Sequence, residues 1–293
     1  MTSRRELLEK ARRIEIKSRK LVSASMAGEY QSVFRGTGVE FESVREYVFG
    51  DDVRTIDWNV TARAGKPHVK QFVESRERSV LLVLDRSASL DFGSGERTKA
   101  DVAAEIAAVL AVAGTLGRDR VGLLQVTDRV ESFVRPSAEP HQDHRLVTEI
   151  VGLEPKGRGF DLELAVSELE RRLPRRSVTF VISDFRDPVP IRPLNRLRSR
   201  HDVIAARVTD PRELRLEGTG VVRCVDPSTG DEFDLDLGSA KERAAFAAAA
   251  DTWMAERAAE LKSGGTELVE FSTDVDVLRP ILALFERRER RVR

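Results

Sequence analysis

The sequence predicts a three-layer α/β protein with a doubly wound, mostly parallel sheet, preceded by a β-rich N-terminal extension. From residue 79 onward, short apolar runs such as residues 80–85 (VLLVLD) and 177–184 (SVTFVISD) alternate with amphipathic helical segments. Fully apolar strands between helices indicate a sheet that is covered on both faces. Residues 36–78 have a different composition from the rest of the chain, with frequent glycine, aromatic and β-branched residues. We therefore expect an N-terminal segment over residues 1–78 and an α/β domain over residues 79–293.

The N-terminal segment contains two kinds of pattern. In the first 20 residues, charged residues alternate with Leu7, Leu8, Ile14 and Ile16, which predicts one amphipathic helix. Residues 58–73 (WNVTARAGKPHVKQFV) predict two strands joined by a turn at residues 64–67.

The α/β domain is predicted element by element from the same periodicities. Strands are expected at residues 80–85, 120–128, 129–134, 177–184, 202–210 and 267–273. Helices are expected at residues 99–116, 143–153, 161–173, 240–262 and 275–290. Residues 221–237 predict a β-hairpin that turns around residues 228–231.

Composition excludes several classes of function. The chain has 293 residues, and its 49 basic residues balance 49 acidic ones, so no global field favours nucleic acid. The single cysteine, Cys224, excludes an internal disulfide and a cysteine-based zinc cluster. No apolar run reaches the roughly 20 residues of a membrane span, and no secretory signal is evident. We therefore expect a cytoplasmic protein without a membrane span.

Polar side chains follow two of the predicted strands. Asp85, Ser87 and Ser89 come directly after one strand, and Asp184 ends another. Ligands of open parallel sheets bind beyond the carboxyl ends of the strands. A carboxylate followed by two hydroxyls suits Mg²⁺ or Mn²⁺. The alternative is that these are capping and turn residues, because serine and aspartate oxygens accept hydrogen bonds from free backbone amides.

These motifs carry a family resemblance. Residues 84–89 (LDRSAS) and 181–184 (VISD) resemble the von Willebrand factor type A fold and its metal-ion-dependent adhesion site. Residues 38–77, 201–214 and 272–288 are similar to the bacterial family named domain of unknown function 58. The resemblance implies that Ser87, Ser89 and a threonine from a second loop touch the metal, while Asp85 and Asp184 act mainly through water.

The second loop departs from that pattern. It reads GRGFDLELAV, so Phe160 stands at the threonine position and offers no ligand oxygen. The metal site is then weakened, completed by Asp161 or water, or lost. We interpret Asp161 as the N-cap of its helix, with Glu163 in the first turn favouring the helix dipole.

The extension contains acids of its own. Asp51, Asp52 and Asp57 are candidates for acid/base or metal chemistry. The favoured interpretation is an ion-pair network in which Arg54 and Arg63 neutralise these acids beside a buried Trp58.

These observations favour a non-enzymatic binding or adaptor protein that recruits a partner through the strand-tip face. The resemblance implies a MoxR-type AAA+ ATPase as the partner, in the assembly or maturation of client proteins. One alternative is a metal-dependent hydrolase or phosphoryl-transfer enzyme. It would use Asp85 and Asp184, together with Asp51, Asp52 and Asp57 of the extension. Another is a scaffold that binds partners without metal, because Phe160 has removed the ligand.

Overall fold

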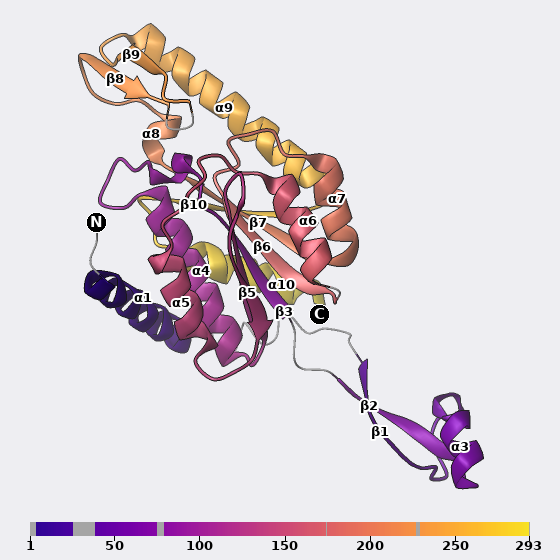
Figure 1. Ribbon diagram of the computed structural model, residues 1–293. Coiled ribbons are helices and arrows are strands. Elements are labelled where there is room, and N and C mark those ends of the chain that lie inside the picture. Colours follow the sequence, from indigo (N-terminus) through magenta and orange to yellow (C-terminus); the bar gives the residue numbers. More distant parts are fainter. Residues whose placement is uncertain (1–3, 26–38, 75–78, 174, 227–228, 293) are drawn as a thin grey trace.

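The computed structural model describes residues 4–25, 39–74, 79–173, 175–226 and 229–292 (Figure 1). Its α-helices are α1 (Arg4–Ser25), α3 (Trp58–Ala64), α4 (Lys99–Leu116), α5 (Gln142–Gly152), α6 (Leu162–Arg172), α7 (Ile191–Arg200), α8 (Pro211–Leu214), α9 (Ala240–Ser263) and α10 (Leu278–Val292). Two short 3-10 helices are η1 (Val53–Thr55) and η2 (Ala88–Asp91). The strands are β1 (Val39–Glu46), β2 (His68–Glu74), β3 (Ser79–Asp85), β4 (Arg120–Val126), β5 (Val130–Ser137), β6 (Ser177–Ser183), β7 (Asp202–Thr209), β8 (Val221–Val225), β9 (Glu232–Asp236) and β10 (Glu267–Ser272).

Six strands form the central sheet in the order β10-β7-β6-β3-β4-β5. All neighbours are parallel except β5, which runs antiparallel to β4 at one edge. The first strand of this sheet in the chain is β3, which lies in its middle. The chain then adds β4 and β5 on one side of β3 and crosses to β6 on the other side. The predicted doubly wound, mostly parallel sheet is confirmed. Because the direction of building reverses between β3 and β6, a ligand site is expected at the carboxyl ends of these two strands.

Helices cover both faces of this sheet, which gives three layers (Figure 1). In β3, Leu82 and its alternate neighbours face one apolar core, which α4, α5 and α10 complete. Leu81 and Val83 face the opposite core, which α6, α7 and α9 complete. This alternation explains why β3 is apolar along its length: side chains of successive residues point to opposite faces, and both faces are buried.

The apolar helix α4 is buried on nearly all sides. It lies against the sheet, and α1 and α5 cover its outer side, with Ala11 of α1 packed against Ala108 and Val147. Lys17 and Arg19 of α1 also form ion pairs with Glu105 of α4 and Asp143 of α5. The predicted N-terminal helix is confirmed, and it packs on the α/β body. Among the described residues, no helix is long and apolar enough to span a bilayer.

The extension, which the structure describes over residues 39–74, is partly helical, and this corrects one prediction. Residues 58–64 form α3 rather than a strand, while His68–Glu74 form β2, which pairs antiparallel with β1. Asp57 caps α3 by accepting hydrogen bonds from the backbone N–H groups of Asn59 and Val60. Gly65, with φ of 72°, ends the helix in the left-handed conformation that glycine adopts without a steric penalty.

The predicted ion-pair network of the extension is also different. Asp51 pairs with Arg45 through two hydrogen bonds of 2.6 and 2.7 Å, instead of with Arg54 or Arg63. This hydrogen bonding by Arg45 lowers the pKa of Asp51 to about 2. Trp58, expected to be buried, is 70% exposed. The unit is too small to enclose it, because its only described layers are a two-stranded sheet and two turns of helix.

A buried carboxylate holds three loops of the strand-tip edge together. Asp210 follows β7 and accepts hydrogen bonds from the backbone N–H and hydroxyl of Ser94, at 2.9 and 2.6 Å. It also accepts from the Thr273 hydroxyl at 2.6 Å and the Arg212 N–H at 2.8 Å. Although burial acts to raise it, these hydrogen bonds hold the pKa of Asp210 below its ordinary value. The loops after β3, β7 and β10 are thereby fixed to one another.

We expect Asp210→Asn to lower the free energy of unfolding by about 2 kcal/mol near neutral pH, because an amide cannot accept all four hydrogen bonds. Because the pKa is depressed in the folded state, the stabilisation is present above the ordinary pKa and is lost as pH falls. The difference between variant and wild type should therefore shrink below about pH 4. Urea denaturation at several pH values measures this, with the exposed Asp231→Asn as control; a pH-independent difference would contradict it.

Candidate functional site at the strand tips

Asp85 lies at the carboxyl end of β3 and is only 1% exposed. One carboxylate oxygen accepts a hydrogen bond of 2.7 Å from the backbone N–H of Ser87. The other oxygen accepts a hydrogen bond of 2.6 Å from the hydroxyl of Ser183, which ends β6. The two strands of the switch point are therefore joined through Asp85, and both of its oxygens have fixed directions.

The loop after Asp85 brings two hydroxyls together. The Oγ atoms of Ser87 and Ser89 lie 3.1 Å apart, and both residues are buried. Ser87 is the N-cap residue of η2, a short 3-10 helix in which Ser89 and Leu90 are buried. The loop is tied to the second loop, because the Ala88 N–H donates to the Arg158 carbonyl at 2.8 Å. Three oxygen-bearing residues predicted from the sequence thus form one compact group.

Asp85 has an unusual charge environment. Burial raises its pKa to about 7, and the neighbouring Asp184 carboxylate adds to this rise. The hydroxyls of Ser183 and Ser87 oppose the rise by donating to the carboxylate. Two carboxyl groups thus share one buried region, where a positive charge is favoured.

Lys99 supplies a positive charge at Asp184. Its ammonium is 0% exposed and donates to Asp184 and to Glu213 of α8, each at 2.7 Å. The chain turns sharply after Asp184, because Phe185 adopts a left-handed conformation with φ of 50°. The structure therefore brings Asp184 to the strand-tip face as predicted. It also pairs Asp184 with Lys99, which in turn binds Glu213, and the sequence did not identify either residue as part of the site.

The second loop packs closely but contributes no side-chain oxygen at its key position. A Cβ atom on Gly157 would lie 2.1 Å from the Thr127 hydroxyl, so only glycine allows this approach to the end of β4. Phe160 packs against the core formed with α6, α7 and α9. Asp161 caps α6 by accepting from the Leu164 N–H at 2.9 Å, as predicted. Its carboxylate is engaged at the helix start.

The acids of the extension belong to a different part of the molecule. Asp52 caps η1 and Asp57 caps α3, while Asp51 pairs with Arg45. This unit leads into the start of β3 at Ser79, whereas Asp85 ends that strand (Figure 1). The structure does not bring these acids to Asp85 and Asp184.

The chemistry of the strand-tip site follows from this donor set. It combines two hydroxyls, a buried carboxyl group and an ion pair. Within the described ranges, no three side chains drawn from histidine, cysteine, aspartate and glutamate converge as a metal cluster would require. Hydroxyl oxygens are hard donors, so the loop after β3 suits a hard cation or a polar group of a partner.

The fold and this site together define the class of protein. A doubly wound sheet with an antiparallel edge strand, and an Asp-x-Ser-x-Ser loop at its switch point, is von Willebrand A-like. The chain belongs to the family described as "Protein of unknown function DUF58", whose model matches residues 43–256.

Similar proteins occur in mycobacteria. The uncharacterized proteins Rv1480 of Mycobacterium tuberculosis (strain H37Rv) and Mb1516 of Mycobacterium bovis are each 34% identical to this chain over 284 residues. The matched region covers 95% of this chain and 89% of each relative.

Two solved structures are similar at lower identity. The conserved hypothetical protein BatB from Bacteroides thetaiotaomicron is 14% identical with a TM-score of 0.48, covering 73% of this chain and 99% of that chain. A von Willebrand factor type A protein from Catenulispora acidiphila is 19% identical with a TM-score of 0.33, covering 61% of this chain and 43% of that chain.

We expect Lys99→Met to lower the free energy of unfolding by about 3–5 kcal/mol, because it leaves the buried carboxylate of Asp184 without its cation and removes one of the two cations beside the partly buried Glu213. Chemical denaturation followed by circular dichroism measures the change. Lys241→Met, which removes an exposed lysine from α9, is the matched control and should stay within about 0.5 kcal/mol of wild type. Equal stability of the Lys99 variant and wild type would show that this ion pair is not required.

Proposed function

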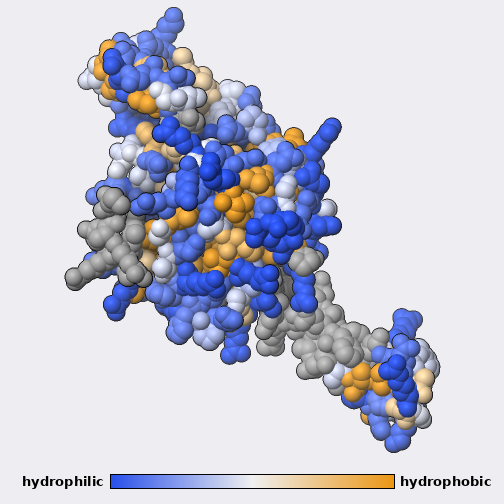
Figure 2. Space-filling model, viewed as in Figure 1, coloured by the Kyte–Doolittle hydropathy of each residue, from blue (hydrophilic) through white to orange (hydrophobic). Residues whose placement is uncertain are grey.

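We propose that this protein is a non-enzymatic adaptor that binds protein partners, with the strand-tip face as one contact surface and the tip of the extension as another. The observation that carries the proposal is a cluster of exposed apolar side chains in the extension. Phe49 is 99% exposed, and Val48, Val53 and Trp58 are each more than half exposed. Figure 2 shows apolar surface on this unit. We call these four residues the apolar tip.

The apolar tip supports binding because exposure of large apolar side chains carries a cost that a partner removes. All four side chains occur within eleven residues, and two of them are aromatic. Aromatic residues supply a large part of the binding energy in protein interfaces. Contiguous apolar surface rimmed by charged residues is typical of interaction sites. The four apolar side chains lie in one short segment, which also contains the exposed charged residues Asp52 and Arg54.

The strand-tip face supports a second contact. It lies at the end of β3, whereas the extension leads into the start of the same strand. Two surfaces at the two ends of one strand suit a protein that connects two partners. The class of one partner comes from the family resemblance, which implies a MoxR-type AAA+ ATPase acting in the assembly or maturation of clients.

We also propose that the strand-tip face binds a divalent cation. The loop after β3 fits a hard cation, because Ser87 and Ser89 present adjacent hydroxyls beside Asp85. Asp184 would face the same region, although Lys99 already neutralises it. Phe160 adds no oxygen. When bound, Mg²⁺ or Mn²⁺ would offer a coordination position to a carboxylate of the partner.

Calorimetric titration tests the cation separately from the partner. If the loop binds it, Mg²⁺ or Mn²⁺ should bind with about one equivalent, and Asp85→Ala and the double variant Ser87→Ala/Ser89→Ala should abolish the heat. Asp231→Ala is the control, because this exposed acid lies in the turn of the β8–β9 hairpin. Absence of heat in folded wild-type protein would remove the cation from the proposal and leave a metal-free docking face.

Partner binding is measured with a purified MoxR-type AAA+ ATPase from the same genome, with nucleotide present and with or without chelator. We expect Phe49→Ser and Trp58→Ser each to weaken binding roughly tenfold or more, because exposed aromatic contacts are lost. Phe233→Ser, which alters a half-exposed phenylalanine of β9, should leave the dissociation constant unchanged.

The outcomes separate the proposals. Equal affinity of all three variants would contradict the apolar tip as a contact surface. If the ATPase does not bind in any nucleotide state, the class of partner is wrong. Metal-dependent hydrolysis of a phosphate ester that Asp85→Ala abolishes would instead establish the enzymatic alternative.

A further inference from the structure

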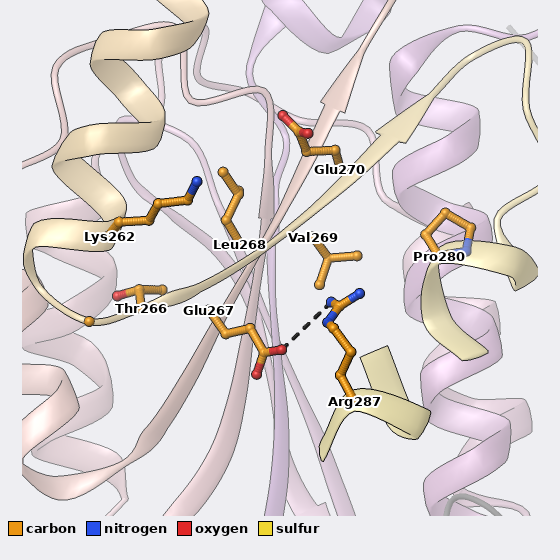
Figure 3. A pocket seen from close by; sticks show the side chains of 9 residues that line it. Lys262, Thr266, Glu267, Leu268, Val269, Glu270, Pro280 and Arg287 are labelled. Atoms are coloured by element: carbon orange, nitrogen blue, oxygen red, sulfur yellow. Dashed lines mark ion pairs between the residues drawn. The ribbon is translucent and has the colours of Figure 1, made fainter. Parts of the chain in front are cut away.

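Strand β10 forms one edge of the central sheet, and a groove of about 570 Å³ runs along it. Residues 265–270 form its floor, Lys262 of α9 lies on one side, and Pro280 and Arg287 of α10 lie on the other (Figure 3). The groove is thus defined by the exposed edge of a strand between two helices. It lies outside the strand-tip site and outside the apolar tip.

The backbone of β10 has groups that point into this groove. The Thr273 N–H donates to the Thr209 carbonyl of β7, and the Thr209 hydroxyl donates to the Phe271 carbonyl. The backbone groups of the odd-numbered residues of β10 therefore face β7. Successive residues of a strand direct their backbone groups to opposite sides, so those of Leu268 and Glu270 face outward. Within the described part of the chain, these outward N–H and C=O groups have no hydrogen-bond partner.

The side chains around the groove favour negative charge. Lys262 is exposed and forms no ion pair within the described residues. The two glutamates of β10 are already engaged, Glu270 by Arg207 and Glu267 by Arg288 and Arg287. The dashed line in Figure 3 marks the pair between Glu267 and Arg287. Arg287 on the α10 side shares Glu267 with Arg288, so the cation that a ligand meets without a carboxylate partner is Lys262 on the α9 side.

A buried hydroxyl in the same groove is also unsatisfied. Thr266 is 3% exposed, and its Oγ1 atom has no hydrogen-bond partner. Figure 3 shows this side chain beside Glu267 at the start of β10. A buried hydroxyl without a partner costs free energy, so the start of β10 has a polar group that the described residues leave unsatisfied.

We propose that the β10 edge binds an extended, acidic segment of a partner protein, which adds to the sheet as a seventh strand. The backbone of that segment pairs with the N–H and C=O groups of Leu268 and Glu270. Its side chains alternate between the α9 side, where Lys262 lies, and the α10 side, where Arg287 lies. Main-chain hydrogen bonds provide affinity in this mode of recognition, and the flanking charges provide specificity.

A second copy of this chain fits the edge less well than an acidic segment. Antiparallel pairing of two β10 strands places the two α10 helices on the same face of the joint sheet. Helix α10 has five arginines and two glutamates, so two such helices would repel each other. Charged residues beside an edge strand also prevent unselective pairing with apolar strands.

The test uses a fluorescent seven-residue peptide in which aspartate alternates with valine, and the full-length protein. We expect saturable binding by fluorescence anisotropy, and loss of binding when lysine replaces aspartate or proline replaces the central residue. Two further peptides carry N-methyl groups on the odd-numbered or on the even-numbered amides. One of them should bind more than roughly tenfold more weakly and the other almost as well as the unmodified peptide, because only alternate amides face the edge. Lys262→Glu should weaken binding, whereas the control Lys241→Glu, on the same helix, should not.

Amide hydrogen exchange of the wild-type protein provides a readout that needs no variant. The peptide should slow exchange at Leu268 and Glu270, while Val269, which faces β7, should change little. Equal binding of both N-methylated registers would show simple ionic attraction and overturn the proposal. Protection of Leu268 that rises with protein concentration in the absence of peptide would overturn it in favour of paired copies. Neither outcome depends on whether the apolar tip or the strand-tip face binds a partner.

Discussion

The strand-tip face depends on the buried ammonium of Lys99. This group begins α4, the helix that the sheet, α1 and α5 enclose, and it meets a carboxylate after β6 and another in α8. A charge buried this deeply is tolerated only because it is shared between two acids. The position of α4 and the conformation of the loop after β6 are therefore linked. Asp85, one strand away, is left with hydroxyl and amide donors instead of a cation.

Charge at this face is thus divided between two neighbouring regions. The charge of Lys99 is balanced by Asp184 and Glu213, and Asp210 ties the adjoining loops together through four hydrogen bonds. The Asp85 region is rich in hydroxyls and has a carboxyl group whose pKa is raised by burial. A partner that brings positive charge, or a cation held jointly with a partner, would be favoured in the second region and not in the first.

The sequence predicted the sheet well because burial on both faces leaves a direct trace in β3 and β6. It also predicted that Asp85, Ser87, Ser89 and Asp184 gather, since the carboxyl ends of parallel strands meet at one edge. It could not predict the partners of Lys99, because Asp184 and Glu213 are 85 and 114 residues away and only the fold brings them together. The helix at residues 58–64 was missed because Val60 and Thr61 favour strands, while the Asp57 cap and Gly65 decide the local structure. Trp58 was expected to be buried by its type, but the small extension has no core to receive it.

The extension is an insertion with two covalent attachments. Helix α1 precedes it and packs on α4 and α5, and β3 follows it at the centre of the sheet. A tensile load applied at Phe49 or Trp58 would therefore divide between a surface helix, held by small apolar contacts and ion pairs, and a central strand, held by hydrogen bonds on both sides. The helix is the weaker anchor. Under pulling, α1 would detach from α4 before β3 left the sheet, and this would uncover apolar surface of α4 while the sheet stayed whole.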